Sequence, residues 1–517
     1  MKLSAYAFKR FWSVHAWAGV VTSLVVYVMF VLGSLVLFYR QLTVWEEPLM
    51  QRPPIRLESL GEPLSLARPL PEEFYYYLPN AERALPKVGY FLAGTTQWRM
   101  WWLDSEVGKL IPQRELAAAY LYDLHYLWHE VTGYWLQYGA GVLVFGFLLA
   151  VVTGVLIHLK DLVAQFYQFR PRQTQRVLWS DLHKVTGVFG LPFQLVYALT
   201  GTLMALSPLV FQLAVGPIFG GDERQAVETA GALVDDPPPR DYGAASRPLP
   251  LDVLTQRALA AEPRLEPESF VFRGFEREQG TVDVRGPIRG QPFGEGLVRV
   301  RASDGAVERI ETPDRETAVG GVARWIHGLH TVEYGGFSAR ILIFVLAISG
   351  CVAILTGNWV WLARRQSRTP GFGNVLLARL TAGVGAGTPV AVAALLLGSR
   401  ILPLEWAGRT KAEELILASA FLASVVYALI SKRTASTWWR LLATSGLLLL
   451  AVPLAARHHS QVGLLGAGPH QAVVVGVEVA LLGVAITLIV GAVLMRGLML
   501  QSPSSGVEEP FTAVGHD

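Results

Sequence analysis

Long apolar runs alternate with polar segments along this chain, and the longest exceed the roughly 20 residues that a helix needs to cross a bilayer. The runs cover residues 11–39, about 138–159, 185–215 and 339–362, then 380–398, 413–430, 441–456 and 471–495. This pattern predicts an α-helical integral membrane protein with about eight transmembrane helices. The first run shows no small-residue cleavage site, so we expect it to remain as an anchor.

The polar segment after the first run contains strand-like aromatic stretches. Residues 74–77 and 98–102 are rich in Phe, Tyr and Trp, which favours β-strands. Residues 104–108 then form an expected turn into a further strand. The segment therefore predicts a small α+β module.

The second long polar segment predicts a similar module. Residues 251–262 have a helical pattern, and Asp304-Gly305 is typical of a hairpin turn. Strands are expected near residues 269–275, 280–286 and 297–302. The Pro-rich residues 235–250 predict an extended linker before this module.

These elements divide the chain into seven parts. They are a first span (1–40), a first module (41–134), two spans with a basic loop (135–215), a second module (216–335), a fourth span (336–368), four further spans (369–500) and a tail (501–517). We expect the first four spans to form one bundle and the last four to be an addition to it.

Basic residues predict how the chain crosses the membrane. They cluster after the second and fourth runs, as Lys160, Arg170, Arg172, Arg176, Lys184, Arg364, Arg365 and Arg368. Because basic loops stay on the cytoplasmic side, both termini are expected to be cytoplasmic and both modules external.

The composition agrees with a membrane protein and excludes several cofactors. Hydrophobic residues make up 52% of the 517 positions and charged residues only 16%. No basic stripe is visible, so a nucleic-acid partner is not expected. Cys351 is the single cysteine, which excludes an intrachain disulfide, covalently attached c-type haem and an iron–sulfur cluster.

Histidines lie at the ends of the first four runs. They are His15, His125, His129, His158, His183, His327 and His330. An ionisable residue inside a bilayer is costly, which favours a functional role. Neutral imidazole is also the usual protein ligand of b-type haem iron, so the chain is predicted to carry haem.

An internal repeat relates the first and third runs. His15 is followed four and eighteen residues later by Gly19 and Gly33, and His183 is followed by glycine at the same two offsets, Gly187 and Gly201. At about 1.5 Å per residue, eighteen residues are close to the hydrocarbon thickness of a bilayer. Both histidines are therefore expected near the inner surface.

The second and fourth runs form the other repeated pair, with one difference. Thr153-Gly154 and Thr356-Gly357 occupy equivalent positions. Four residues later, however, the second run has His158 and the fourth has Trp361. His158 thus has a role that the second half of the repeat does not supply.

Two layers of histidines follow from this arrangement. The inner layer contains His15, His158 and His183, and the outer layer contains His125, His129, His327 and His330. Each layer can supply two axial ligands, so we expect two non-covalently bound haem b groups.

Other interpretations of the histidines stay open. The pair His125 and His129 has the spacing of a zinc clamp, although no acidic residue accompanies the histidines within the spans. His125 and His327 also suit plain hydrogen-bonded positions at the interface. The remaining histidines, His458, His459, His470 and His516, are expected to be ordinary loop or tail residues.

Spacing alone does not fix the ligand pairs. In the outer layer it cannot separate His125 from His129, and we favour His129 with His330. In the inner layer we expect the unmatched His158 to ligate iron together with His15 or His183. The remaining histidine would then contact a propionate or an electron donor near Arg170, Arg172 and Arg176, and the symmetric pair of His15 with His183 is the alternative.

Five strings resemble the PepSY-associated transmembrane helix family. They are LHYLWHEVTGYW, VVTGVLIHLKD, FYQFRPRQTQRVLWSDLHKVTG, WIHGLH and LTGNWVWLARR. The resemblance covers residues 1 to about 368, and it implies PepSY modules in the two external segments. Similar members are iron-regulated inner-membrane proteins of Gram-negative bacteria, including di-haem siderophore reductases.

The resemblance implies transfer of electrons from an inner to an outer haem and on to a ferric siderophore, or another ferric chelate, in the periplasm. Reduction would release Fe(II), because hard oxygen donors suit Fe(III) much better. The glycines at 383–387 and 466–468 follow no strand, so no dinucleotide site is expected, and the former suit helix packing. A membrane quinol or a separate cytoplasmic reductase is the expected donor.

Two other functions remain open. One is a non-enzymatic membrane protein whose PepSY modules sense a signal or inhibit a protease. The other is a transporter of iron or its chelate through the last four helices, where Glu478 is the clearest intramembrane charge. Trp98, Trp101 and Trp102 suit either a chelate site or ordinary strand packing.

Overall fold

The computed structural model describes most of the chain as two compact units. It covers residues 4–52, 55–80, 83–92, 97–104, 108–127, 134–160, 164, 166–170, 173–223, 225–226, 241–365, 371–455 and 471–501. We call the first unit the helical unit; it contains Met1–Glu46, Leu116–Pro208 and Gly335–Asp517. We call the second the sheet unit; it contains Glu47–Glu115 and Leu209–Tyr334.

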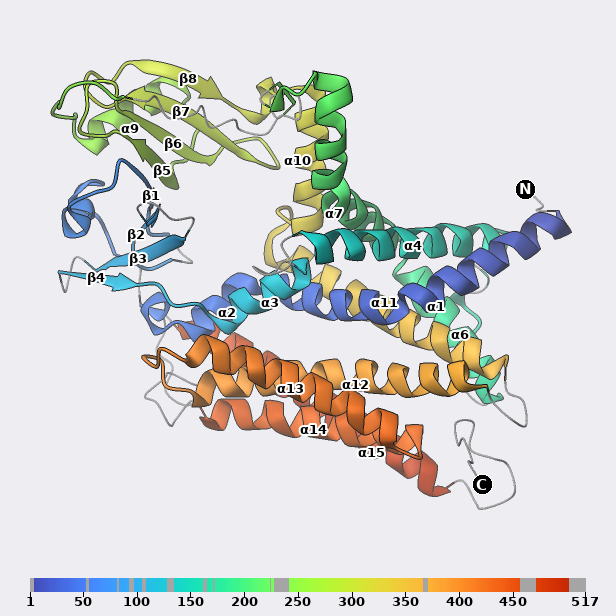
Figure 1. Cartoon of the computed structure of the whole chain (residues 1–517). Helices are drawn as coiled ribbons and strands as arrows, with labels where there is room; N and C mark the ends of the chain where they lie inside the picture. The colour runs from blue at the N-terminus through green and yellow to red at the C-terminus, as the bar shows by residue number, and fades with distance from the viewer. Residues whose placement is uncertain are drawn as a thin grey trace. The chain divides into compact units, whose positions relative to one another are not determined.

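Within the described residues, eight helices are long and apolar enough to cross a membrane. They are α1 (Ala5–Val36), α4 (Trp135–His158), α7 (Leu191–Phe219), α11 (Gly336–Ala363), α12 (Phe372–Ile401), α13 (Arg409–Ile430), α14 (Thr434–Ala455) and α15 (Ala472–Gln501) (Figure 1). Each coincides with one of the apolar runs, which confirms the predicted number of spans.

The third span differs from its prediction because a separate helix precedes it. Helix α6 (Gln175–Phe189) ends at Gly190, whose N–H donates to the carbonyl of Thr186. Helix α7 then begins at Leu191, with Pro192 in its first turn. Hydropathy does not detect the start of α6, because its first residues are polar. The helical segment therefore begins at Gln175, ten residues before the predicted position 185.

Two short helices of the helical unit escaped the sequence analysis. Helix α2 (Tyr39–Glu46) follows α1 directly, and α3 (Ala117–Tyr126) precedes α4. Helix α3 ends at Leu127, which has a left-handed backbone with φ of 53°. Both helices are too short to be recognised from hydropathy, yet α3 carries His125.

In the part of the sheet unit that the structure describes, eight strands form one antiparallel sheet in the order β4-β3-β2-β1-β5-β6-β7-β8. The strands are β1 (Glu73–Tyr77), β2 (Lys87–Phe91), β3 (Trp98–Asp104), β4 (Lys109–Pro112), β5 (Ser269–Arg273), β6 (Thr281–Pro287), β7 (Glu295–Arg301) and β8 (Val307–Glu311). The two predicted modules are thus joined through β1 and β5, with Tyr75 opposite Val271, rather than folding as separate bodies.

Alternation along the strands builds the core of this unit. Phe74, Phe272 and Val282 lie on one face of the sheet, and they pack with Leu254 of α9 (Leu251–Ala261). The predicted helix, the predicted strands and the turn at Asp304-Gly305 are confirmed. A further helix, α10 (Ala318–Thr331), was not predicted, and it carries His327 and His330.

The last four spans pack tightly, and α12 is the most enclosed of them. A Cβ at Gly387 of α12 would lie 2.6 Å from Cβ of Ser424 on α13, and one at Gly383 would lie 3.1 Å from the α-carbon of Val425. These glycines therefore allow close helix contact, as predicted for residues 383–387.

Candidate functional site

A cavity of about 390 Å³ lies within the helical unit and is lined by residues of α1, α4, α6, α7 and α11. It is lined by His15, His158 and His183, which are the three histidines of the inner layer. The structure therefore brings together the three residues that the repeat placed near one surface. A cavity of this size falls within the range of roughly 300–1,000 Å³ that is common for small-molecule and cofactor sites.

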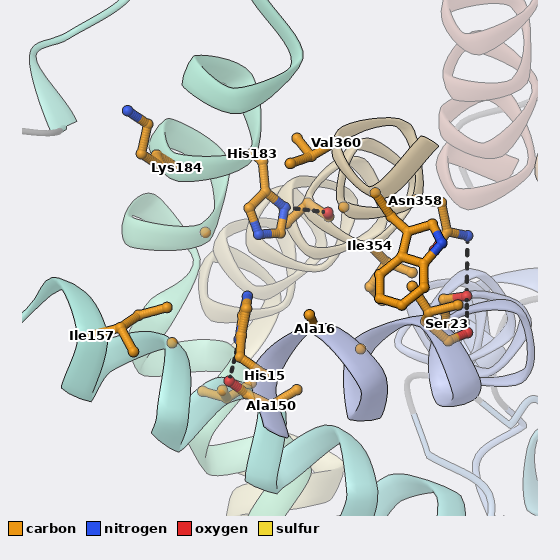
Figure 2. Close-up of a pocket in the computed structure, with 18 of the residues that line it drawn as sticks. His15, Ala16, Ser23, Ala150, Ile157, His183, Lys184, Ile354, Asn358 and Val360 are labelled. Atoms are coloured by element: carbon orange, nitrogen blue, oxygen red, sulfur yellow. Dashed lines mark hydrogen bonds between the residues drawn. The ribbon is translucent and has the colours of Figure 1, made fainter. Parts of the chain in front are cut away.

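His15 and His183 face one another across this cavity (Figure 2). Their ring centres are 6.0 Å apart, and the ring planes are inclined by 59°. Nδ1 of His15 lies 2.8 Å from the carbonyl oxygen of Ala150, and Nδ1 of His183 lies 2.8 Å from that of Ala353. Because a carbonyl only accepts, each Nδ1 carries the proton, and each Nε2 keeps a lone pair.

The two contacts repeat each other in detail. In each contact, the imidazole binds the carbonyl of an alanine and also lies against the glycine four residues later on the same helix. A Cβ at Gly154 would be 3.0 Å from Cε1 of His15, and one at Gly357 would be 3.2 Å from Cε1 of His183. The repeat seen in the sequence thus corresponds to a repeated contact between a histidine helix and a glycine helix.

Open space lies beside both histidines on their own helices. Gly19 and Gly187 line the cavity one turn after His15 and His183, and a Cβ at either glycine would meet no atom within 4 Å. A larger side chain at these positions would extend into unfilled space. The +4 glycines of the repeat therefore contribute volume to the cavity instead of a helix contact.

Basic side chains also line the cavity. Lys184, Arg364 and Arg365 are among its lining residues. The guanidinium carbon of Arg364 lies 4.4 Å from the ring centre of Trp12, and that of Arg365 lies 3.3 Å from the ring centre of Trp361. A concave site with several cations favours an anionic ligand. The cavity therefore combines two imidazoles with a locally positive lining.

The basic loop is anchored next to this cavity. Asp181 is fully buried on α6, and it binds Arg170 at 2.9 Å and Lys184 at 3.3 Å. The hydrogen bonds from Arg170 hold the pKa of Asp181 below its usual value, even though burial opposes this. Of the other predicted loop contacts, Arg176 lies on α6, whereas Arg172 lies outside the described residues.

His158 lines the cavity from the last turn of α4, and Trp361 lines it at the equivalent position of α11. The role of His158 as an axial ligand stays a prediction. The opposed geometry with matched carbonyl contacts is that of His15 and His183, which were the alternative inner pair. The geometry thus gives the stronger case to the symmetric pair.

Polar residues that the sequence did not single out also line the cavity. Asn358 donates through Nδ2 to Ser23 at 3.0 Å (Figure 2). It also donates to Thr381 at 3.1 Å. Gln194 is 6% exposed, and its Nε2 has no hydrogen-bond partner among the described residues. Amides inside apolar runs were the available signal, because such groups are expensive in a bilayer.

In the outer layer, His125 has the same surroundings as the inner pair. Its Nδ1 lies 3.1 Å from the carbonyl oxygen of Met29 on α1. A Cβ at Gly33, one turn later on α1, would lie 2.7 Å from Cε1 of His125. Burial lowers the pKa of His125 to about 4, so its imidazole is neutral near pH 7.

The other histidines of the outer layer are placed differently. His129 lies outside the described residues, so the preference for it stays a prediction. On α10 of the sheet unit, the exposed His327 donates to Glu333 at 3.1 Å, and this hydrogen bond raises its pKa. His330 lies two residues before Val332, which ends α10 with a left-handed φ of 55°.

Helices α3 and α10 share a local arrangement, because His125 likewise lies two residues before the left-handed Leu127. A left-handed backbone is uncommon for residues other than glycine, and the position is unfavourable for the β-branched Val332. The matched backbones make His125 and His330 equivalent members of the repeat. They separate His125 from His129, which spacing alone could not do.

The alternative zinc site of His125 with His129 stays a prediction, because His129 lies outside the described residues. Among the described residues, no group of three or more His, Cys, Asp or Glu side chains is placed to hold a metal ion. Trp102 is buried, Trp101 stacks on Tyr90 at 4.5 Å, and Trp98 contacts Tyr75 at 5.1 Å, which are strand-packing contacts. His458, His459, His470 and His516 lie outside the described residues.

Comparison with known proteins places the chain in a family. A protein of Pseudomonas aeruginosa, described as uncharacterized, is 30% identical over 286 residues, which cover 51% of this chain and 69% of that protein. The family described as PepSY-associated TM region matches residues 12–364. That match includes every histidine of the two layers, whereas α12 to α15 follow it. The chain is therefore a multi-pass membrane protein that belongs to the PepSY-associated TM region family.

Proposed function

We propose that this protein is a di-haem b electron-transfer protein of the bacterial inner membrane, which reduces a ferric siderophore or another ferric chelate in the periplasm. The observation that carries the proposal is the opposed pair of His15 and His183, each fixed through Nδ1 to a carbonyl. The substrate class rests on the resemblance of the histidine motifs to siderophore reductases.

The spacing of the two imidazoles fits a shared metal ion. With metal–nitrogen bonds of about 2 Å, two imidazoles on opposite sides of one ion have ring centres roughly 6 Å apart. The ring centres of His15 and His183 are 6.0 Å apart. Histidines that bind metal also commonly donate their other N–H to a carbonyl, as both do here.

The walls of the cavity fit a flat, anionic macrocycle. Open space at Gly19 and Gly187 leaves room beside both rings, and Lys184, Arg364 and Arg365 would neutralise the propionates. Phe147, Val151 and Ile354 supply apolar surface for the rest of the ring. Haem b held by two histidines has no open coordination position, which suits it to electron transfer rather than oxygen chemistry.

The residues of the cavity have separate tasks in this proposal. The carbonyls of Ala150 and Ala353 fix the orientation and tautomer of the two imidazoles. The cations stabilise negative charge, and their position on the positively charged side of the spans favours the cytoplasmic side for this haem. The apolar side chains exclude water and so limit side reactions.

A second haem is proposed at His125, because its contacts with Met29 and Gly33 repeat those of the inner pair. Two centres are needed because the hydrocarbon core is about 30 Å thick. His330 stays the expected second ligand, as in the pair predicted from the sequence. The matched backbones of α3 and α10 favour His125 over His129 as the first.

The terminal steps follow from the position of the two haems. A membrane quinol or a cytoplasmic reductase would supply electrons on the side of Lys184 and Arg364. A ferric chelate would accept them on the opposite side, and the resulting Fe(II) would leave its hard oxygen ligands more readily. The described residues contain no strand–glycine–helix unit for a nicotinamide cofactor.

The proposal is tested with the full-length protein purified in detergent from haem-supplemented cells. We expect two haems per chain, a b-type spectrum after dithionite reduction, and reoxidation by ferric siderophores with Fe(II) captured by ferrozine. A colourless protein would contradict the haem proposal and favour the non-enzymatic PepSY function. A reducible protein that no ferric chelate reoxidises would keep the haems and overturn the substrate.

A further inference from the structure

Helix α3, which carries His125, begins at a carboxylate from another helix. Glu46 is the last residue of α2 and is 2% exposed. Its two carboxylate oxygens accept the N–H groups of Ala117 at 2.9 Å and Ala118 at 3.2 Å. These are the first two residues of α3.

This carboxylate replaces the usual cap of a helix. The first amides of a helix have no partner within it, and a side chain at the N-cap normally accepts one of them. The N-cap of α3 is Leu116, which makes no such bond. Glu46 therefore supplies both the acceptors and a negative charge that favours the positive end of the helix.

Glu46 is in turn held by the C-terminal helices. Arg409, the first residue of α13, donates to Glu46 at 3.2 Å and is almost fully buried. The same guanidinium donates to the carbonyls of Leu402 at 3.0 Å and Ser399 at 2.7 Å, and it pairs with Glu413 at 2.9 Å. Arg409 thus joins the C-terminal end of α12 and the N-terminal end of α13 to the start of α3.

A second buried cation holds the neighbouring residue. Arg400 of α12 lies over the ring of Trp45 at 3.9 Å, and it pairs with Glu478 of α15 at 3.3 Å. Glu478 thus belongs to this cluster, which gives no support to a transport pathway at that residue. Around these charges, Leu121 of α3 shares one apolar core with Leu396 and Leu417.

We propose that Glu46 and Arg409 are positioning residues for His125, so that the four C-terminal helices set the orientation of this ligand through α3. The inference rests on the proposed function, because it assumes that His125 binds the outer haem. His125 lies eight residues after Ala117, about 12 Å along the helix axis. A tilt of the capped end therefore moves the imidazole relative to Met29.

Burial explains why the arrangement depends on both partners. A buried ion pair is stable only while its hydrogen bonds are satisfied, and removing one partner leaves an uncompensated charge. Without Arg409, the carboxylate of Glu46 would take up a proton or draw water into the contact. Either change weakens the acceptor for Ala117 and Ala118, so α3 loses its fixed starting point.

The test compares Arg409→Met, Arg409→Lys and Glu46→Gln in the full-length, haem-loaded protein. Lys411→Met is the matched control, because Lys411 lies two residues further along α13 and is exposed. The haem that disappears in His125→Ala defines the outer signal, and the inner haem is the internal reference. The readouts are low-temperature electron paramagnetic resonance, the midpoint potential of each haem and haem content.

We expect Arg409→Met and Glu46→Gln to alter the resonance signal and potential of the outer haem alone. The amount of outer haem retained per chain should fall roughly two- to ten-fold. Replacing a residue that contacts a metal ligand directly typically costs more, about 10- to 100-fold. Arg409→Lys should restore part of the signal, and Lys411→Met should leave it unchanged. If Arg409→Met does not accumulate, Glu46→Gln decides by the same criteria.

The failures of the two proposals are distinguishable. Wild-type protein without haem would overturn the proposed function. Wild-type protein with two haems, combined with an unchanged outer signal in both Arg409→Met and Glu46→Gln, would overturn this inference alone. Equal changes at both haems would also overturn it, because they would indicate general destabilisation rather than positioning of His125.

Discussion

Glycines serve opposite purposes in two regions of the helical unit. Around the cavity, a Cβ at Gly19 or Gly187 would meet no atom within 4 Å. In α12, a Cβ at Gly385 would lie 2.6 Å from the ring of Trp438, and one at Gly387 would lie 2.6 Å from Ser424. The first region keeps space open, whereas the second uses small residues to bring helices together.

This difference separates a binding region from a supporting one. In membranes, close helix contact replaces much of the hydrophobic driving force, so packed glycines stabilise the fold. Open glycines beside two opposed imidazoles contribute no helix contact, and the proposed haem would occupy the space beside them. The two regions share one chain and one residue type, so substitutions at both kinds of glycine test the distinction.

The largest effect is expected at the open glycines. Gly187→Leu should fold with an unchanged unfolding temperature in the haem-free state, because its side chain enters unfilled space. The same side chain would occupy the place proposed for the macrocycle, so bound haem should fall from two per chain to one. Pyridine haemochrome assays measure this loss, and full haem content with normal spectra would contradict the proposed location.

A packed glycine should give the opposite result. Gly387→Leu places atoms where Ser424 already lies, and overpacking of this kind costs about 1–3 kcal/mol of unfolding free energy. Thermal unfolding in detergent should show a lower midpoint, while the protein that does fold keeps both haems. Loss of haem without loss of stability would remove the contrast between the two regions.

An intermediate effect is expected where the two regions meet. Asn358 of α11 donates to Ser23 of α1 and Thr381 of α12, and it also lines the cavity. Asn358→Leu removes two buried hydrogen bonds and leaves their hydroxyl partners without this donor, which should cost about 1–3 kcal/mol. Thermal unfolding measures the cost, and Asn358→Asp would serve as the comparison that keeps the size of the side chain.

The smallest effect concerns His327, which is more exposed than the other described histidines of the two layers. Its folded pKa is raised above 6.5 by Glu333, so the contact stabilises the fold fully below pH 6.5 and is lost as pH rises through the folded pKa. The pair is partly exposed at 55% and 38%, so its contribution is about 0.5 kcal/mol or less.

His327→Gln should therefore lower the unfolding temperature at pH 5.5 but not at pH 8.5, with haem content unchanged at both. Glu333→Gln should reproduce the same dependence, because it removes the other partner of the pair. An equal effect at both pH values would indicate that the contact is not a charged one.

Much of the fold followed from hydropathy, whereas the contacts between distant segments did not. Apolar length is a property of each span by itself, so all eight spans were predicted. The pairing of β1 with β5 joins residues nearly 200 positions apart, and nothing in either strand identifies its partner. Helix α3 was missed because its ten residues are stabilised by Glu46 rather than by an apolar run.

The three histidines of the cavity were predicted as a set, and the pair of His15 with His183 was the alternative rather than the favoured pair. The repeat identified His15 and His183 as equivalent, because equal offsets along a helix mark the same face. It could not give the distance between their rings, which depends on how four helices pack. His158 was favoured as a ligand because the equivalent position of α11 holds Trp361, and this role stays a prediction.

The central claim is that His15 and His183 form the axial pair of one haem, and alanine substitution of the three cavity histidines tests it most directly. Haem content and low-temperature electron paramagnetic resonance should be measured on purified His15→Ala, His183→Ala and His158→Ala. We expect each of the first two variants to lose the bis-imidazole signal of one haem, and His158→Ala to keep two haems with both signals. Loss of a haem signal in His158→Ala, with both signals retained in His15→Ala or His183→Ala, would contradict it.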